Sequence, residues 1–157
     1  KEFFALKFDI ITSFEVIEHI NNPNSEIELI KKVLRKGGAY YVTTPNFNAL
    51  SRHLLKEKWN IIEYPEHLSY YTPRTLTKLM NQHGFKAKFV DTTGISLAKY
   101  NLISTNASIP ASEPITNEQL RDKIEHNPLL LIAKKTINFF LNLFKLGDAM
   151  KALYVNS

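Results

Sequence analysis

Three ionisable side chains lie within an apolar segment near the start of the sequence. In "FEVIEHI", residues 14–20, the polar residues are Glu15, Glu18 and His19, at positions i, i+3 and i+4. On a helix this spacing places all three side chains on one face. Carboxylates and an imidazole that share a face can move protons or hold a cation. What the segment does depends on what it faces.

A second group of candidates lies in the aromatic segment 47–71. His67, in "YPEHLSYYTP", has a side chain that titrates near neutral pH, which suits a general base or a group that positions an acceptor. The alternative is a loop histidine that bonds a backbone carbonyl. Tyr64, Tyr70 and Tyr71 are candidates for the wall of an aromatic or sugar pocket, although aromatic side chains in such a loop also serve to pack it down.

The elements around the first group predict a βαβ unit. "FDIITSF" at 8–14 is typical of a strand, and its apolar residues on both faces indicate a strand covered on both sides. A helix follows, which Asn22 caps and Gly37 ends. The segment 39–44 predicts a second strand that stops at Pro45. A strand, helix and strand in this order imply parallel pairing and a right-handed crossover.

The rest of the chain continues the alternation. A helix is expected from a cap at Thr72 to a terminator at Gly84, followed by a strand at 86–94. Residues 104–117 are expected to form an exposed loop. A further helix is expected from residue 127 up to Gly147, and a last strand at 151–156.

The helix that begins at residue 127 is amphipathic. Its polar side chains gather on one narrow arc, and most of the remaining arc is apolar; the polar residues are Lys134, Lys135, Asn138, Asn142 and Lys145. One interpretation is a helix packed across a sheet, and another is a helix that binds a membrane surface or a partner. We favour the first.

Composition limits the class of protein. The 157 residues include 44% apolar and 22% charged residues, which fits one globular domain. The absence of cysteine favours a reducing compartment, so a cytoplasmic location is expected. The net charge of +5 is spread along the chain without a basic run, and we expect no nucleic-acid partner.

In an open parallel sheet, ligands bind outside the carboxyl ends of the strands. The segment from Glu15 to His19 follows the first strand, and Asn46 follows the second. Both are therefore expected to line one crevice, with the segment 47–71 folded over it. Asn46 is a candidate to hydrogen-bond a ligand in this crevice; the alternative is a simple turn residue after Pro45.

At this point the sequence resembles a known family. "FDIITSFEVIEHI", "LRKGGAYYVTTPN" and "PEHLSYYTPRTLTKLMNQHGF" are similar to the second half of class I S-adenosylmethionine-dependent methyltransferases, in the branch that includes ubiquinone-biosynthesis O-methyltransferases and small-molecule or sugar methyltransferases. The resemblance covers about residues 6–94, with weaker similarity at "LGDAMKALYV". It implies an α/β fold, the C-terminal half of a Rossmann-like sheet (strands four to seven) with flanking helices. The chain would divide into the second half of the core at 1–94, an exposed loop or insertion at 95–126, and an amphipathic helix with the last strand at 127–157.

The resemblance also implies roles for the candidate residues. Phe14 and Glu15 would lie beside S-adenosylmethionine, the expected cofactor. The expected catalytic residues are Glu18, His19 and His67, and the expected acceptor-binding residues are Asn46, Tyr64, Tyr70 and Tyr71. In some relatives a similar Glu-x-x-Glu-His pattern holds a divalent cation, so Mg²⁺ at Glu15, Glu18 and His19 is an alternative. We favour side chains that hydrogen-bond near the strand end and predict no metal, because a mixed histidine and carboxylate set is unusual for Mg²⁺.

The chain departs from the family in one respect. The sequence has five glycines and no Gly-x-Gly loop for the cofactor. We therefore interpret it as a fragment of a methyltransferase that acts on a small hydroxylated acceptor, inactive by itself. The alternative is a non-catalytic module that assembles through the exposed edge of its half-sheet, as a homodimer, or that makes peripheral contact with a membrane.

Overall fold

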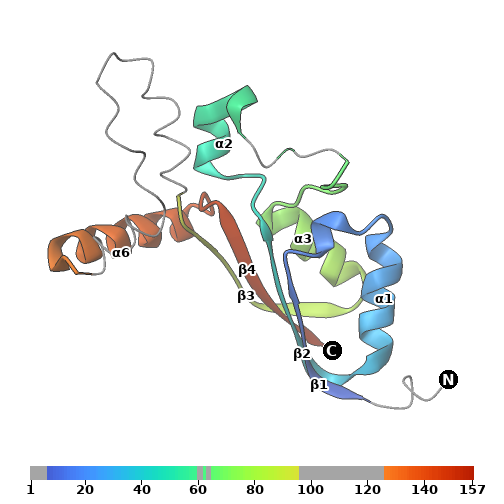
Figure 1. Ribbon diagram of the computed structural model, residues 1–157. Coiled ribbons are helices and arrows are strands. Elements are labelled where there is room, and N and C mark those ends of the chain that lie inside the picture. Colours follow the sequence, from blue (N-terminus) through green and yellow to red (C-terminus); the bar gives the residue numbers. More distant parts are fainter. Residues whose placement is uncertain (1–6, 60–61, 63–64, 96–125) are drawn as a thin grey trace.

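A four-stranded sheet forms the centre of the molecule (Figure 1). The computed structural model describes residues 7–59, 62, 65–95 and 126–157. The strand order is β1-β2-β4-β3, with β1 parallel to β2 and with β4 antiparallel to both of its neighbours. The strands are β1 (Phe8–Phe14), β2 (Leu34–Pro45), β3 (Phe85–Thr93) and β4 (Ala149–Asn156). The expected α/β class and the parallel βαβ unit are confirmed.

Two helices, α1 (Pro23–Val33) and α3 (Pro73–Gln82), begin where their sequence signals predict. The Asn22 side chain accepts a hydrogen bond from the backbone of Ser25, and Pro23 takes the first helical position. At α3, Thr72 and Thr75 form a reciprocal capping box. These caps satisfy backbone donors that would otherwise lack partners at the helix starts.

One face of the sheet carries the core. Apolar side chains of α1 and α3 pack with the strands in a single buried cluster, in which Ile27, Leu76, Met80, Val42 and Ala152 are fully buried. Burial raises the pKa of Tyr40 and of Tyr154 to about 12, so both phenols in this core stay neutral at physiological pH.

The other face of the sheet is open in the part of the chain that the structure describes. Ile10 is 63% exposed and Phe14 60% exposed, and the rings of Phe14, Tyr41 and Phe89 lie in a row across the sheet. The prediction that β1 is covered on both sides is therefore wrong for the described residues. The apolar residues on this face have no cover there.

Helix α1 ends four residues earlier than expected. Leu34 is extended (φ −85°, ψ 134°) and already pairs with Phe8 of β1, so the helix stops at Val33 and not at Gly37. Gly37 does adopt a left-handed conformation, with φ +75°, but within the first part of β2. Burial of Leu34 in the core outweighs the helix propensity of the residues that follow.

The aromatic segment after β2 is not a plain loop. It contains a short helix α2 (Leu50–Leu55) and a 3₁₀ turn η3 (Lys56–Lys58). Leu55 and Trp59 are buried in a small second cluster, which gives these turns an apolar anchor.

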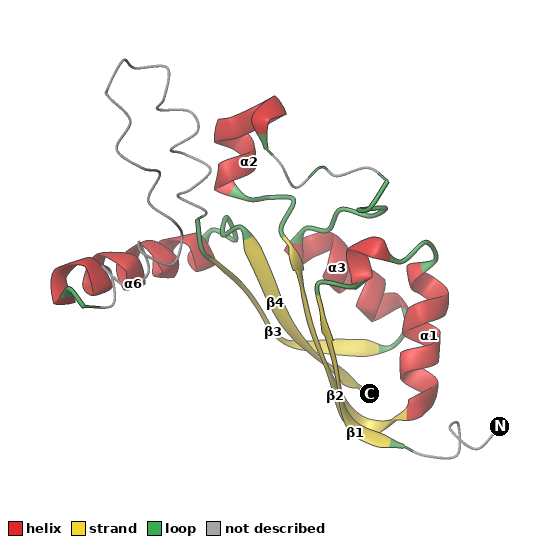
Figure 2. Cartoon of the chain, viewed as in Figure 1, coloured by secondary structure: helices red, strands yellow, loops and turns green. Residues whose placement is uncertain are grey.

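The last helix, α6 (Pro128–Leu143), extends from the β3 edge of the sheet (Figure 2). Asn127 caps it by accepting from the backbone of Leu129 and Leu130. The helix ends at Leu143, short of the expected Gly147. The loop predicted at 95–126 lies almost entirely outside the described residues.

Candidate functional site

The carboxyl end of β1 is held against β2 by a strained residue. The backbone N–H of Glu15 donates to the carbonyl of Thr43 (3.0 Å), and Glu15 has a φ of +51°, in the left-handed region that favours glycine. Although Glu15 as a whole is exposed, partial desolvation of its carboxyl raises the pKa of that group above its ordinary value, and a hydrogen bond with the Thr43 side chain partly offsets this. A strained backbone beside a carboxyl of raised pKa is typical of a functional position.

Glu18 is the buried centre of the crevice. It lies in the 3₁₀ turn η2 (Ile17–His19), its exposed fraction is 2%, and the hydroxyl of Thr44 donates to its Oε2 (2.9 Å). Its Oε1 has no hydrogen-bond partner among the described residues. A carboxylate oxygen buried in this way is costly unless something binds it.

The same residue holds the segment after position 65 over the crevice. The backbone carbonyl of Glu18 accepts hydrogen bonds from the N–H groups of Leu68 (2.8 Å) and Ser69 (3.0 Å). Phe47 donates its N–H to the carbonyl of Tyr71 (2.8 Å), which ties the other end of the segment to the end of β2. The end of β1, the end of β2 and the segment 65–71 therefore meet at one place, as expected.

Two histidines flank Glu18. Nδ1 of His19 lies 2.7 Å from the carbonyl oxygen of Glu66, and a carbonyl only accepts hydrogen bonds. The proton of neutral His19 is therefore on Nδ1, which leaves Nε2 as an acceptor. The rings of His19 and His67 meet edge to face with their centroids 4.8 Å apart.

Glu18, His19 and His67 bring one ligand atom each to within 4.8 Å of one another. This set differs from the one that the sequence pattern offered for Mg²⁺, because His67 takes the place of Glu15. Two imidazoles and one carboxylate are softer ligands than Mg²⁺ prefers and are closer to a zinc-type set. The donors therefore do not fit Mg²⁺.

A small cavity of about 10 Å³ opens beside this cluster, which is room for one water molecule. Its lining comes from η2, from the end of β2 and from the aromatic segment: Glu18, Thr44, Pro45, Phe47, Trp59, His67, Ser69 and Tyr70. The ring of Tyr70 contacts both Phe47 and His67. The cavity lining therefore combines aromatic rings with a carboxylate and an imidazole.

Two of the predicted acceptor-binding residues, Asn46 and Tyr71, are buried. Asn46 is fully buried, and its amide donates to the carbonyls of Lys145 (3.0 Å) and Gly147 (2.8 Å), which uses both of its hydrogens. Tyr71 is 7% exposed and packs in the main core. The Asn46 amide is therefore committed to the fold, and the acceptor-binding roles of Asn46 and Tyr71 stay predictions. Tyr64 lies outside the described residues.

Sequence reasoning missed Thr44 and the carbonyl of Glu66. Thr44 fixes the Glu18 carboxylate, and Glu66 fixes the histidine tautomer. The position of Thr44, directly before Pro45 at the end of a buried strand, is a signal that points to the crevice. The Glu66 carbonyl carries no sequence signal.

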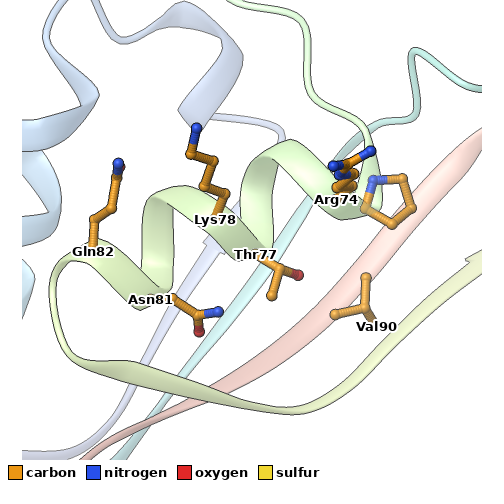
Figure 3. Close-up of a pocket in the computed structure, with 7 residues that line it drawn as sticks. Arg74, Thr77, Lys78, Asn81, Gln82 and Val90 are labelled. Carbon is orange, nitrogen blue, oxygen red and sulfur yellow. The ribbon is translucent and has the colours of Figure 1, made fainter.

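A larger hollow lies elsewhere. A groove of about 610 Å³ runs between α3 and β3, lined by Pro73, Arg74, Thr77, Lys78, Asn81, Gln82 and Val90. Figure 3 shows Thr77 and Asn81 pointing from α3 toward the strand of Val90, whereas Lys78 and Gln82 point away. The groove is open and has no carboxylate or imidazole in its lining, so it is a weaker candidate than the smaller cavity.

Comparison with known proteins gives consistent results. Residues 2–88 match the sequence profile of a family described as a methyltransferase domain. A ubiquinone biosynthesis O-methyltransferase of Glaesserella parasuis is 43% identical over 49 residues, which cover 31% of this chain and 21% of that protein.

Two solved structures share the fold. A SAM-dependent methyltransferase from Thermotoga maritima aligns with a TM-score of 0.55 at 14% identity. The alignment covers 97% of this chain and 58% of the Thermotoga chain. A SAM-dependent methyltransferase from Archaeoglobus fulgidus aligns with a TM-score of 0.51 at 15% identity. The alignment covers 98% of this chain and 63% of the Archaeoglobus chain. The chain therefore spans about a fifth of the curated relative and about three fifths of these two structures.

Proposed function

The chain belongs to the methyltransferase-domain family, and we propose that it forms the acceptor side of a domain that transfers a methyl group from S-adenosylmethionine to the oxygen of a small hydroxylated molecule. S-adenosylmethionine is the cofactor of this family. The observation that carries the proposal is the cluster of Glu18, His19 and His67 at the carboxyl ends of two parallel strands, beneath an aromatic segment.

The residues at the end of β1 fit a cofactor with an ammonium and an adenosine group. Phe14, the last residue of β1, is 60% exposed and offers a ring, and Glu15, directly after the strand, is exposed and offers a carboxylate. When bound, S-adenosylmethionine supplies an electrophilic methyl group on a sulfonium. Phe14 and Glu15 would orient that group toward the crevice, and the segment 65–71 would exclude water from it.

Methylation of a hydroxyl requires removal of its proton. His67 lines the cavity and is the proposed base, which would take up the proton of the acceptor hydroxyl. His19, whose tautomer the Glu66 carbonyl fixes, would hold the edge of the His67 ring. The Glu18 carboxylate lies in the same cluster. Because the cavity itself has room for only one water molecule, a flat acceptor would contact Tyr70 and Phe47 at its mouth.

We also propose that these residues make up the second half of the methyltransferase sheet. Within the described residues, β1 pairs only with β2, and the apolar row of Phe14, Tyr41 and Phe89 lies open on one face. Both features leave room for further strands and helices at the β1 side. A homodimer that pairs two β1 edges would use the same surface, and it is the second candidate assembly.

The experiment uses the natural protein with labelled S-adenosylmethionine and three acceptors: a phenol, a catechol and a sugar. His67→Asn should lower the turnover number by about 10² to 10⁴ without an equal change in cofactor affinity. The residual rate should rise with pH as the acceptor ionises by itself. His53→Asn, an exposed histidine on α2, is the matched control and should behave as wild type. Full activity of His67→Asn across the pH range would refute the role of His67, and no transfer to any hydroxyl acceptor would refute the acceptor class.

A further inference from the structure

Helix α6 is attached to the sheet by its polar side. The Asn142 side-chain oxygen accepts from the backbone N–H of Thr92 (3.0 Å), and that of Asn138 accepts from Gly94 (3.0 Å). The Lys145 ammonium donates to the carbonyl of Val90 (2.6 Å). These bonds run along the end of β3 and fix the rotation of the helix about its own axis.

The apolar side of α6 consequently faces outward. Eight large apolar side chains between Leu129 and Phe144 are exposed, with exposed fractions from 45% to 76%: Leu129, Leu130, Ile132, Ile137, Phe139, Phe140, Leu143 and Phe144. We call this set the outer face of α6. An amphipathic helix on a soluble domain normally has the opposite orientation. A patch of this kind marks an interaction site.

The outer face lies apart from the open strand edge of the sheet. The open strand edge is at β1, whereas α6 packs on β3, three strands away in the order β1-β2-β4-β3. With strands about 4.8 Å apart, the two lie roughly 14 Å from each other across the sheet. In Figure 1, α6 extends beyond β3, away from β1 and from the helices α1 and α3.

Charge identifies the kind of partner. The segment from Asn127 to Leu146 contains three lysines and no acidic residue. Lys145 is bound to the end of β3, which leaves Lys134 and Lys135 to face a partner. Lys135 is exposed at the border of the outer face. Exposed phenylalanine, leucine and isoleucine bordered by lysine is the pattern of a helix that lies in the interface of an anionic membrane.

We propose that the outer face of α6 docks on the surface of an anionic lipid bilayer, with the helix axis parallel to the membrane plane. No described helix has both the length and the hydropathy needed to cross a bilayer, so the contact is peripheral. The outer face covers about half of the helix circumference, which is wider than the narrow seam of a paired helix. A second copy of the chain is therefore the less suited occupant.

The test is flotation of the natural protein with vesicles of pure phosphatidylcholine and with vesicles of equal parts phosphatidylcholine and phosphatidylglycerol. Wild type should bind the anionic vesicles, more weakly at high salt. Leu129→Gln/Leu143→Gln should weaken this binding by about tenfold or more. Lys135→Gln should weaken it by about fivefold. The matched control, Leu29→Gln/Leu54→Gln, removes two exposed leucines from α1 and α2 and should bind as wild type.

Three results would overturn the proposal. The first is no binding of wild type to anionic vesicles, or equal binding to both vesicle types. The second is a fall in melting temperature of Leu129→Gln/Leu143→Gln well beyond that of the control, because the chain itself would then cover the outer face. The third is a lipid-free dimer, seen by light scattering, that the same variant abolishes, because a second copy would then be the occupant. These readouts do not depend on methyl transfer, so the proposal can fail or hold independently of the catalytic one.

Discussion

The contact between Thr44 and Glu18 provides the sharpest test of how the crevice is built. Thr44 is fully buried, and its hydroxyl donates to the buried carboxylate of Glu18 over 2.9 Å. Thr44→Val keeps the shape of the side chain and removes the donor. A hydrogen bond to a charged group contributes about 1.5–3 kcal/mol, and the added buried methyl returns about 0.8 kcal/mol. The variant should therefore be about 1–2 kcal/mol less stable than wild type.

For a chain of 157 residues, this loss corresponds to a melting temperature about 3–6 °C lower. Urea unfolding followed by circular dichroism measures the change in the free energy of unfolding. Thr12→Val, at an exposed position of β1, is the control and should change this free energy by less than about 0.5 kcal/mol. In a double-mutant cycle with Glu18→Gln, the coupling should be about 1 kcal/mol, since a neutral acceptor gains less from the hydroxyl. A Thr44→Val protein as stable as wild type, with no coupling, would refute the buried carboxylate at this position.

Three further predictions concern the neighbouring positions. Because desolvation raises the pKa of Glu15, the folded state binds the proton of this carboxyl more tightly than the unfolded state does. The free energy of unfolding should therefore fall as the pH rises through that pKa. Glu15→Gln should flatten this part of the profile of unfolding free energy against pH. Gly147→Ala should destabilise the protein by more than about 3 kcal/mol, because a Cβ there would lie 2.4 Å from the backbone nitrogen of Thr93. A Cβ at Gly94 meets no atom within 4 Å, so Gly94→Ala should cost only about 1 kcal/mol for its left-handed backbone. Equal losses of melting temperature in the two variants would contradict this prediction. Asn46→Ala removes two donated hydrogen bonds and one accepted from Asn48. The free energy of unfolding, measured with denaturant, should fall by about 3 kcal/mol. A loss below about 1 kcal/mol would mean that these hydrogen bonds do not stabilise the fold.

Local signals in the sequence predicted a large part of the fold. The caps at Asn22 and Thr72 and the left-handed terminator Gly84 lie where the pattern predicted them, because each depends on residues within one turn. The family and the α/β class are confirmed by the profile match and by the solved structures. The roles of the site residues, the cytoplasmic location and the homodimer stay predictions.

The features that the sequence did not predict depend on contacts between distant parts of the chain. The amide of Asn46 is occupied by carbonyls about a hundred positions later, at Lys145 and Gly147, which no local pattern reveals. The outward orientation of α6 depends on acceptors and donors at the end of β3, such as Thr92. The early end of α1 reflects the pairing of Leu34 with β1. Each of these is a long-range interaction that outweighed a local preference.

The central claim is that the carboxyl end of β1 lies beside the cofactor. Photolabelling of the natural protein with methyl-labelled S-adenosylmethionine, followed by trypsin digestion, tests it directly. The label should appear in the peptide from Phe8 to Lys31, which contains Phe14 and Glu15, and unlabelled S-adenosylhomocysteine should compete it away. Label in the peptide from Phe89 to Lys99 instead, or label that S-adenosylhomocysteine does not displace, would contradict the account.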